Sequence, residues 1–310
     1  MNTAAQSDGR QAACDGFIVV AVLWMLGALA VLASIYSVYV IDTAAGFGPY
    51  QDRYRAQMLA SAAVELAAYQ LIPAGGSPPT HGQFDFRMGR ANVAVEFRSE
   101  AARIDLNAAP KELLAGLFRA LGVQHEEAQA HAERIVGWRT TPGPGEDTEA
   151  SAYRAAGLKY APRGGRFPHV GELSLVLGLP AALVERTLPF VTVYSGNAKI
   201  NIMDAAPEVV AALPGLTPER LNAVLAARRT ASGDGQALIA LLGPAQAHAT
   251  TEGSRASRVG IRIAFDNGRR MSFEVVILPF EEGPDPYSVL SWRDESDDAR
   301  VRPAARTALR

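Results

Sequence analysis

The sequence predicts an α+β fold with an N-terminal membrane-spanning helix, and three observations lead to this prediction. A long uncharged apolar run opens at Phe17. Segments of alternating apolar and polar residues, typical of half-buried strands, occur both early and late in the chain. The pattern between them is mainly helical, so we expect a small antiparallel sheet that is interrupted by a large helical insertion.

The N-terminal segment begins with a polar leader, residues 1–16, in which Arg10 is the only basic residue. The uncharged run from Phe17 to Ile41 is about 25 residues long, enough to cross a hydrocarbon core about 30 Å thick. A conventional cleaved secretory signal is disfavoured, because it has a basic start and a shorter apolar region. The Gly16-Phe17 boundary resembles a prepilin peptidase site, which implies cleavage between the two residues and N-methylation of Phe17. The alternative is an uncleaved signal anchor with a chance Gly-Phe pair.

Most pilins and pseudopilins have a glutamate at the fifth position of the mature helix, and Ala21 takes that place here. A carboxylate in the bilayer costs about 2.5–3.5 kcal/mol unless it meets a partner such as the terminal amine of a neighbouring subunit. A subunit with nothing ahead of it has no such partner. The alanine therefore favours a first subunit, at the tip of a filament.

After the apolar run, Gly46-Phe47-Gly48-Pro49 is expected to bend or interrupt the helix. Helical spacing then resumes, and we expect an apolar stripe to pack on a sheet as the second half of a stem helix. The stripe consists of Met58, Leu59, Ala62, Ala63 and Leu66.

The strand predictions rest on strict alternation. The alternating residues are Val93, Val95 and Phe97, then Val259, Ile261, Ile263 and Phe265, and finally Phe273, Val275 and Ile277. Asp266-Asn267-Gly268-Arg269 predicts a hairpin turn, because Asn-Gly favours left-handed dihedrals. An edge strand is expected near Val289 to Trp292, and disorder beyond Asp294.

Two segments resemble each other: RIDLNAAPKELL from Arg103 and KINIMDAAPEVV from Lys199. Each is expected to end a strand and open a helix, with Pro110 or Pro207 at the first helical position and with Asn107 or Asp204 capping exposed amides. We interpret them as two small related helical domains.

The second copy continues into a segment similar to a helix-hairpin-helix, Leu213 to Arg229. Modules of this kind grip DNA phosphates through a Gly-hydrophobic-Gly turn, whereas the turn here, Gly215-Leu216-Thr217, lacks the second glycine. Arg220, Arg228 and Arg229 are candidate anion contacts. The alternative function is thus a membrane-anchored helix-hairpin-helix DNA-binding or DNA-uptake protein, but a formal net charge of −2 favours no nucleic acid.

The order of several segments resembles the type II secretion system protein K family, the large minor pseudopilins. The resemblance is carried by GFIVVAVLWML, RIDLNAAPKELL, IVGWR, YRAAGLKYAPRGGRFPHVGELSLVLGL, VTVYSGNAKINIMDAAPEVVAALPGL and PYSVLSWRD. It implies a pseudopilin fold whose insertion contains SAM-like or helix-hairpin-helix-like modules. It also implies a periplasmic domain on a single pass of the bacterial inner membrane, at the tip of a pseudopilus that it initiates or caps to support protein export. The implied partners are minor pseudopilins I and J, the major pseudopilin and prepilin peptidase.

The expected domains follow from these patterns. They are a prepilin leader (1–16), a transmembrane helix (17–41), the stem helix and first strands (42–103), an inserted helical domain (104–190), a second helical module (191–245), a C-terminal β-hairpin with an edge strand (246–293) and a disordered tail (294–310).

No catalytic or cofactor-binding residue is expected. The five histidines, His81, His125, His131, His169 and His248, have no metal-ligand spacing, and the sole cysteine, Cys14, lies in the leader. The resemblance implies that calcium is possible, although no cofactor is required. Glu146, Asp147 and Glu149 lie in one loop, but calcium takes about six to eight oxygen ligands, and Gly137 stands where the family often has an acidic residue. No metal ligand is therefore predicted, and we expect a structural protein rather than an enzyme.

Overall fold

The computed structural model describes residues 11–72, 78–143, 148–230, 235–280 and 285–295, without the side chains of residues 11–17, 41–51, 148 and 230. The chain divides into two compact units, Met1–Met58 and Leu59–Arg310. The leader and the C-terminal tail expected from the sequence fall largely outside the described residues, and those two predictions stay predictions.

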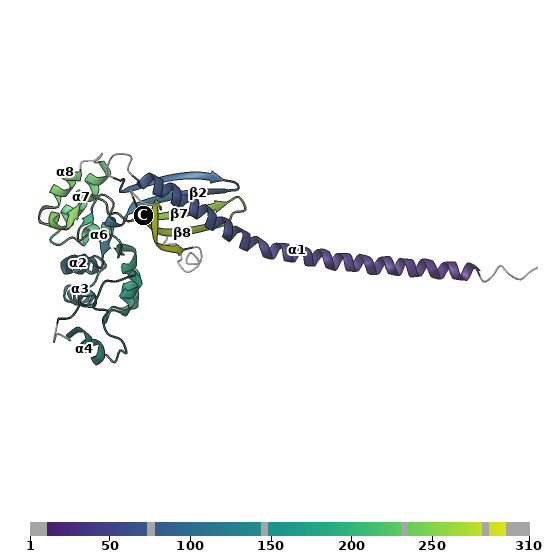
Figure 1. The fold of residues 1–310 in the computed structure, drawn as a ribbon, viewed down its shortest axis with the longest axis horizontal. Coiled ribbons are helices and arrows are strands. Elements are labelled where there is room, and N and C mark those ends of the chain that lie inside the picture. Colours follow the sequence, from purple (N-terminus) through teal and green to yellow (C-terminus); the bar gives the residue numbers. More distant parts are fainter. Residues whose placement is uncertain (1–10, 73–77, 144–147, 231–234, 281–284, 296–310) are drawn as a thin grey trace, which may run out of the picture. The chain divides into compact units, whose positions relative to one another are not determined.

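A single helix, α1 (Gln11–Leu71), accounts for the described part of the first unit and continues into the second (Figure 1). It runs without interruption through Gly46 to Pro49, so of the predicted bend or interruption the interruption is wrong. A proline inside a helix removes one backbone donor, and the turns on either side keep their own hydrogen bonds. One such residue is therefore not enough to end a helix of this length.

The part of α1 from Leu59 to Leu71, which we call the stem, buries a stripe of mostly small side chains. The buried residues are Leu59, Ala60, Ala63, Val64, Ala67, Ala68 and Leu71. Leu59 and Ala63 were predicted correctly, but Met58 and Leu66 are exposed. The prediction favoured bulky apolar residues, whereas a helix that lies close to a sheet buries the small ones, because they allow the backbones to approach.

The second unit contains a five-stranded antiparallel sheet with the strand order β1-β2-β7-β8-β9. The strands are β1 (His81–Met88), β2 (Ala91–Ser99), β7 (Ser257–Phe265), β8 (Arg270–Pro279) and β9 (Tyr287–Asp294). One face carries the buried alternating residues that the sequence predicted, such as Val95, Ile261 and Phe273. The stem packs on this face, and Tyr287 of β9 donates a hydrogen bond to Glu65 at 3.2 Å. The α+β prediction is confirmed.

The predicted hairpin joins β7 to β8, and Gly268 has a φ of 83°. The Asn267 side chain accepts a hydrogen bond from the backbone amide of Arg269 at 3.0 Å, which holds the turn. The edge strand near Val289 is also confirmed, as β9. The sequence analysis missed β1, which has three apolar residues in alternation, Phe84, Phe86 and Met88, and pairs with β2 across a tight turn at Gly89 (φ 59°).

The helical insertion leaves the sheet between β2 and β7, two strands that pair with each other from Ala91↔Phe265 to Ser99↔Ser257. The chain therefore leaves and re-enters the sheet at the same end. Ser99, at the end of β2, links the departing chain to the returning chain, because its hydroxyl accepts a hydrogen bond from the backbone amide of Ser254 at 2.7 Å. The insertion is thus tied to the sheet at its base.

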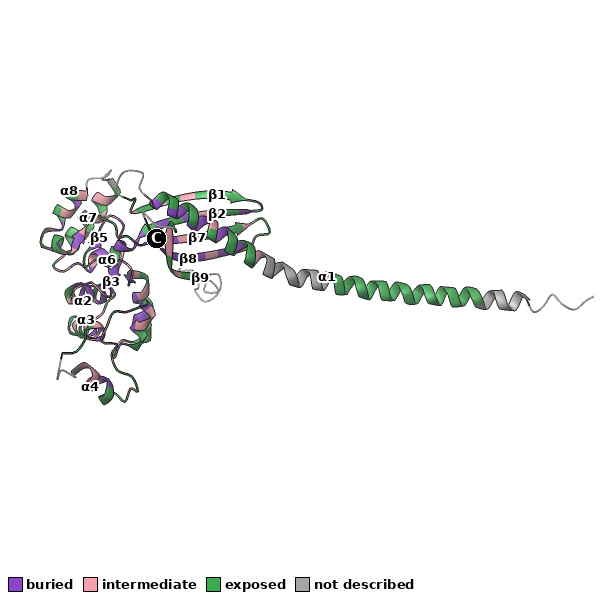
Figure 2. Ribbon diagram, in the orientation of Figure 1, coloured by how far each residue is buried: buried purple, intermediate pink, exposed green. Residues whose placement is uncertain are grey.

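The insertion consists of short helices and two-stranded parallel ladders. Its elements are η1 (Glu100–Ala102), β3 (Ile104–Asp105), α2 (Lys111–Ala120), α3 (His125–Arg139), α4 (Thr148–Ala155), η2 (Val170–Leu175), α5 (Ala181–Thr187), η3 (Leu188–Phe190), β4 (Val191–Thr192), β5 (Ile200–Asn201), α6 (Pro207–Ala211), α7 (Pro218–Thr230), α8 (Gly235–Leu241), η4 (Gly243–His248) and β6 (Ala249–Thr250). One continuous hydrophobic core extends from Ile104 to Ala249 and joins both helical modules (Figure 2).

Candidate functional site

The N-terminal helix contains the one described segment that is long and apolar enough to cross a membrane, Ile18–Val40. None of it is buried, and Figure 2 shows it as exposed along its described length. Ala21 lies within it, as do the small residues Gly27 and Ala30. The side chains of Gly16 and Phe17 lie outside the described residues, so the processing site stays a prediction.

The two resembling segments adopt the same local structure. In the first, Asp105 of β3 accepts a hydrogen bond from the amide of Asn107 at 2.7 Å; in the second, Asn201 of β5 accepts one from Met203 at 2.9 Å. Each strand lies in a parallel ladder, β3 with β4 and β5 with β6. The sequence similarity therefore reflects a repeated strand-turn-helix unit.

An arginine holds each of these turns, and the sequence analysis missed this role. Arg139, at the end of α3, donates hydrogen bonds to the carbonyls of Leu106 and Ala109. Arg228, in the last turn of α7, donates to the carbonyls of Ile202 and Ala205, at 3.0 and 2.6 Å. Burial lowers the pKa of both guanidinium groups. The signal that could have revealed this role is an arginine in the last turn of the second helix of each copy.

The predicted caps are not formed. Asn107 instead spans to the loop before η2, where it accepts a hydrogen bond from the amide of Phe167 at 2.7 Å and donates one to its carbonyl at 3.0 Å. Asp204 accepts a hydrogen bond from Asn201 and lies 2.7 Å from Nδ1 of His81. Pro110 is the N-cap of α2 and Pro207 the first residue of α6, and neither helix has a side-chain cap. Local spacing suggested capping, but tertiary partners compete for both side chains.

The helix-hairpin-helix-like segment uses its arginines internally. Arg228 holds the turn before α6, and Arg220 donates to the carbonyl of Leu242 at 3.2 Å, against Gly243. Of the three candidate anion contacts, Arg220 and Arg229 are exposed and Arg228 is partly buried. The turn between α6 and α7 has its glycine, Gly215, at a φ of 75°. The hairpin therefore works as a packing element of the insertion.

A buried ion-pair network joins the insertion to the sheet. Glu100, whose side chain is fully buried, accepts hydrogen bonds from Nε and Nη2 of Arg258 at 2.6 and 3.1 Å. Thr192 of the insertion also donates to Glu100, and Arg258 in turn contacts Glu274 of β8. Burial lowers the pKa of Arg258, but the carboxylates of Glu100 and Glu274 together raise it above its usual value. This network fixes the base of the insertion on the sheet.

Of the three acidic residues expected in one loop, Glu149 is the one described, and it lies in the first turn of α4. Glu149 is held by Arg134, whose Nη1 lies 3.1 Å from both carboxylate oxygens, while Glu146 and Asp147 fall outside the described residues. Gly137 leaves room for the Glu149 side chain, since a Cβ there would lie 2.9 Å from its Cδ. Within the described residues, no group of three or more His, Cys, Asp or Glu side chains could hold a metal. The calcium binding that the family resemblance allows is not tested by the described residues.

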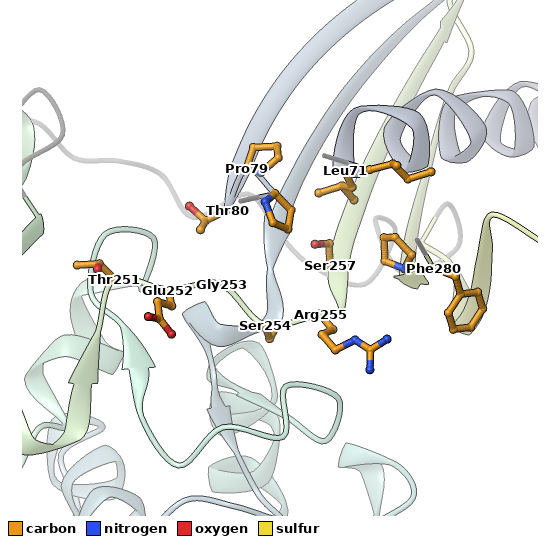
Figure 3. Close-up of a pocket in the computed structure, with 13 residues that line it drawn as sticks. Leu71, Pro79, Thr80, Thr251, Glu252, Gly253, Ser254, Arg255, Ser257 and Phe280 are labelled. Carbon is orange, nitrogen blue, oxygen red and sulfur yellow. The ribbon is translucent and has the colours of Figure 1, made fainter. Parts of the chain in front are cut away.

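A pocket with a volume of about 810 Å³ lies beside the end of the stem (Figure 3). Thr80, Ser254, Ser257, Arg255 and Phe280 are among the residues that line this pocket. The hydroxyl of Ser254 donates to the carbonyl of Ala256 at 2.8 Å and accepts from the amide of Ala101 at 3.1 Å. The hydroxyl of Ser254 therefore holds the backbone where the chain passes between the sheet and the insertion. Among the described residues it is not paired with a general base as a catalytic nucleophile would be.

Residues 92–196 match the family model described as type II secretion system (T2SS), protein K. This part of the chain is similar to protein K. The matched region contains β3, α2, α3 and an aromatic cluster in which Trp138, Tyr153, Tyr160 and Phe167 pack ring against ring. These aromatic residues come from motifs that carried the resemblance to the protein K family.

The fold is similar to that of a solved chain from "The Crystal Structure of the GspK-GspI-GspJ complex from enterotoxigenic Escherichia coli Type 2 Secretion System". The two sequences are 19% identical, the similarity covers 79% of this chain and 97% of that chain, and the TM-score is 0.57. A comparison with curated protein sequences finds no significant match. The similarity in fold thus extends well beyond the region matched by the protein K family model.

Proposed function

We propose that this protein is a minor pseudopilin of a type II secretion system, anchored by one pass of the bacterial inner membrane with its C-terminal domain in the periplasm. The observation that carries the proposal is a large helical insertion between two paired strands, β2 and β7, of a sheet that packs on an N-terminal helix. The match to protein K and the apolar segment Ile18–Val40 support it. The role is one of assembly, in which binding surfaces rather than catalytic residues do the work.

We place the protein at the tip of the periplasmic pseudopilus, where it initiates or caps assembly and supports export of folded proteins across the outer membrane. Residues 100–256 add a bulky insertion at one end of the sheet, which obstructs a further subunit beyond it. Ala21 supports this position, because the helix carries no carboxylate that needs the amine of a subunit ahead of it. The expected partners are minor pseudopilins I and J, by analogy with the solved complex.

Mass spectrometry of the mature N-terminus tests the pathway. In cells with prepilin peptidase we expect a peptide that begins at methylated Phe17, and in cells without the enzyme we expect the intact leader. An intact Met1 chain under both conditions would remove the protein from the pilin pathway. A Gly16→Leu variant is the matched control, since it blocks the cut and leaves the apolar helix unchanged.

Co-purification tests the proposed partners. The full chain, extracted in mild detergent with tagged minor pseudopilins I and J from the same bacterium, should elute as one complex of the three proteins. Separate elution at micromolar concentration would contradict the assembly. Substituting Ala21 by glutamate should weaken tip assembly in cells, because it introduces an unpaired carboxylate into the bilayer.

A further inference from the structure

The sheet face opposite the stem forms a cleft with the insertion, and its volume is about 400 Å³. The charged side chains Arg98, Arg258, Arg262 and Glu274 line the sheet side. Pro189, Phe190 and Ala206 line the side of the insertion. The cleft thus combines an apolar wall with a charged one.

Gly260 forms the floor of this cleft. In the register of the sheet it pairs with Glu96 on β2 and Glu274 on β8, and along its own strand it lies between Arg258 and Arg262 on the same face. A glycine within a strand weakens it and often marks a place where another group approaches closely. A Cβ at this position would meet only the carbonyl oxygen of Glu96, at 3.7 Å, an ordinary contact. Packing within the chain therefore does not require a glycine here.

The cations of the cleft are not equally satisfied. Arg258 binds Glu100 and Glu274, and Arg98 lies 2.9 Å from Glu96. Arg103 reaches Glu274 only at 3.9 Å, beyond hydrogen-bond distance, and Arg262 has no ion-pair partner among the residues that the structure describes.

The charges of Glu100 and Glu274 compensate Arg103 in part, whereas Arg262 has no ion pair with a carboxylate among the described residues. Asp204 faces His81, and Glu274 is already shared with Arg258 and Arg293. Burial, and next the nearby charge of Arg258, lower the pKa of Arg103, whose side chain is 24% exposed. Two guanidinium groups therefore have donors to spare at one cleft.

We propose that this cleft binds an acidic side chain of a protein partner, with its carboxylate on Arg103 and Arg262 and its methylene groups against Phe190. The planar fork of a guanidinium matches a carboxylate. Arg103 is partly desolvated, which strengthens its pair with a carboxylate, and Arg262 is exposed and accessible to a partner. A glutamate fits both walls of the cleft, because it is apolar along its stem and charged at its end. This inference does not depend on the place of the protein in a secretion system.

A titration tests the chemistry of the site. The purified full chain in detergent is titrated with succinate, or with inorganic phosphate, at constant ionic strength. Succinate should bind saturably, and Arg103→Gln and Arg262→Gln should each weaken it about fivefold or more. Arg87→Gln is the control outside the cleft, since Arg87 pairs with Asp266, and it should bind as the unsubstituted chain does. Equal binding by all variants, or phosphate binding tighter than succinate with the same dependence on the arginines, would overturn the proposal.

Gly260→Thr separates binding from folding. The substitution fills the floor of the cleft without a clash in the sheet, so the melting temperature should stay the same or rise while succinate affinity falls at least fivefold. Unchanged affinity would show that the ligand does not reach this floor.

A photo-crosslinking amino acid at Phe190 identifies the source of the carboxylate in cells. We expect a crosslink to another protein at a peptide that contains Asp or Glu, and its loss when Arg262→Gln is added. A crosslink that survives Arg262→Gln, or no crosslink to a protein at all, would refute an acidic protein partner.

Discussion

Replacing Gly116 by alanine should push apart the two helical modules of the insertion. Gly116 lies on α2, where its absent Cβ would be 1.9 Å from the carbonyl oxygen of Ala212, the residue that ends α6. A carbon–oxygen contact needs about 3.3 Å, so the helices would have to separate by roughly 1.4 Å. Overpacking of this kind costs about 1–3 kcal/mol or more, and the backbone position of the clash argues for the upper end. Alanine gains about 1 kcal/mol in helix propensity, so from a cost of about 3 kcal/mol we expect a net loss of about 2 kcal/mol.

The assay is thermal unfolding of the full chain in detergent, followed by intrinsic fluorescence. The expected loss corresponds to a melting temperature lower by roughly 4–8 °C for a unit of this size. Gly137→Ala is the matched control in α3, because its new Cβ would meet the flexible end of Glu149 rather than backbone. It should stay within about 1 kcal/mol of the unsubstituted chain. If Gly116→Ala were as stable as Gly137→Ala, the claim that Gly116 permits close packing between the two helical modules would be refuted.

Two further predictions concern side chains that the structure shows to be paired. Arg139→Ala and Arg228→Ala should each lower the free energy of unfolding, measured by urea titration, by about 2–4 kcal/mol, because each variant leaves two carbonyls without their donor. The control Arg229→Ala, at an exposed side chain, should change it by less than about 0.5 kcal/mol. The Arg163 guanidinium, opposed by burial and aided by Trp138, holds the pKa of Glu172 below its usual value of 4.5. The stability that this ion pair supplies should be present above pH 4.5 and be lost as the pH falls through the lowered pKa of Glu172. In the Glu172→Gln variant that part of the acid dependence of unfolding should be missing. The same acid profile in both proteins would refute the assignment.

Prediction from sequence succeeded where the signal is periodic or is a local turn preference. The alternation in β2, β7 and β8 places apolar side chains on one face, and Asn267-Gly268 supplies the dihedrals that a hairpin needs. The failures have a common cause. Asn107 and Asp204 stand near helix starts but bind partners distant in sequence, and the stem buries small residues rather than the bulky Leu66. Spacing along the chain carries no information about which residue arrives from elsewhere in the fold.

The sequence by itself determined the anchor helix, the α+β class, the hairpin and the repeated strand-turn-helix unit, because each depends on residues close together in the chain. The tertiary structure alone decided which strands are neighbours, how Ser99 and Ser254 close the base of the insertion, and which guanidinium groups are satisfied. Pairing Glu100 with Arg258 requires two residues more than 150 positions apart in the chain to meet. Burial then sets the strength of the ion pairs, since a charge removed from water depends on the oppositely charged partner that the fold provides.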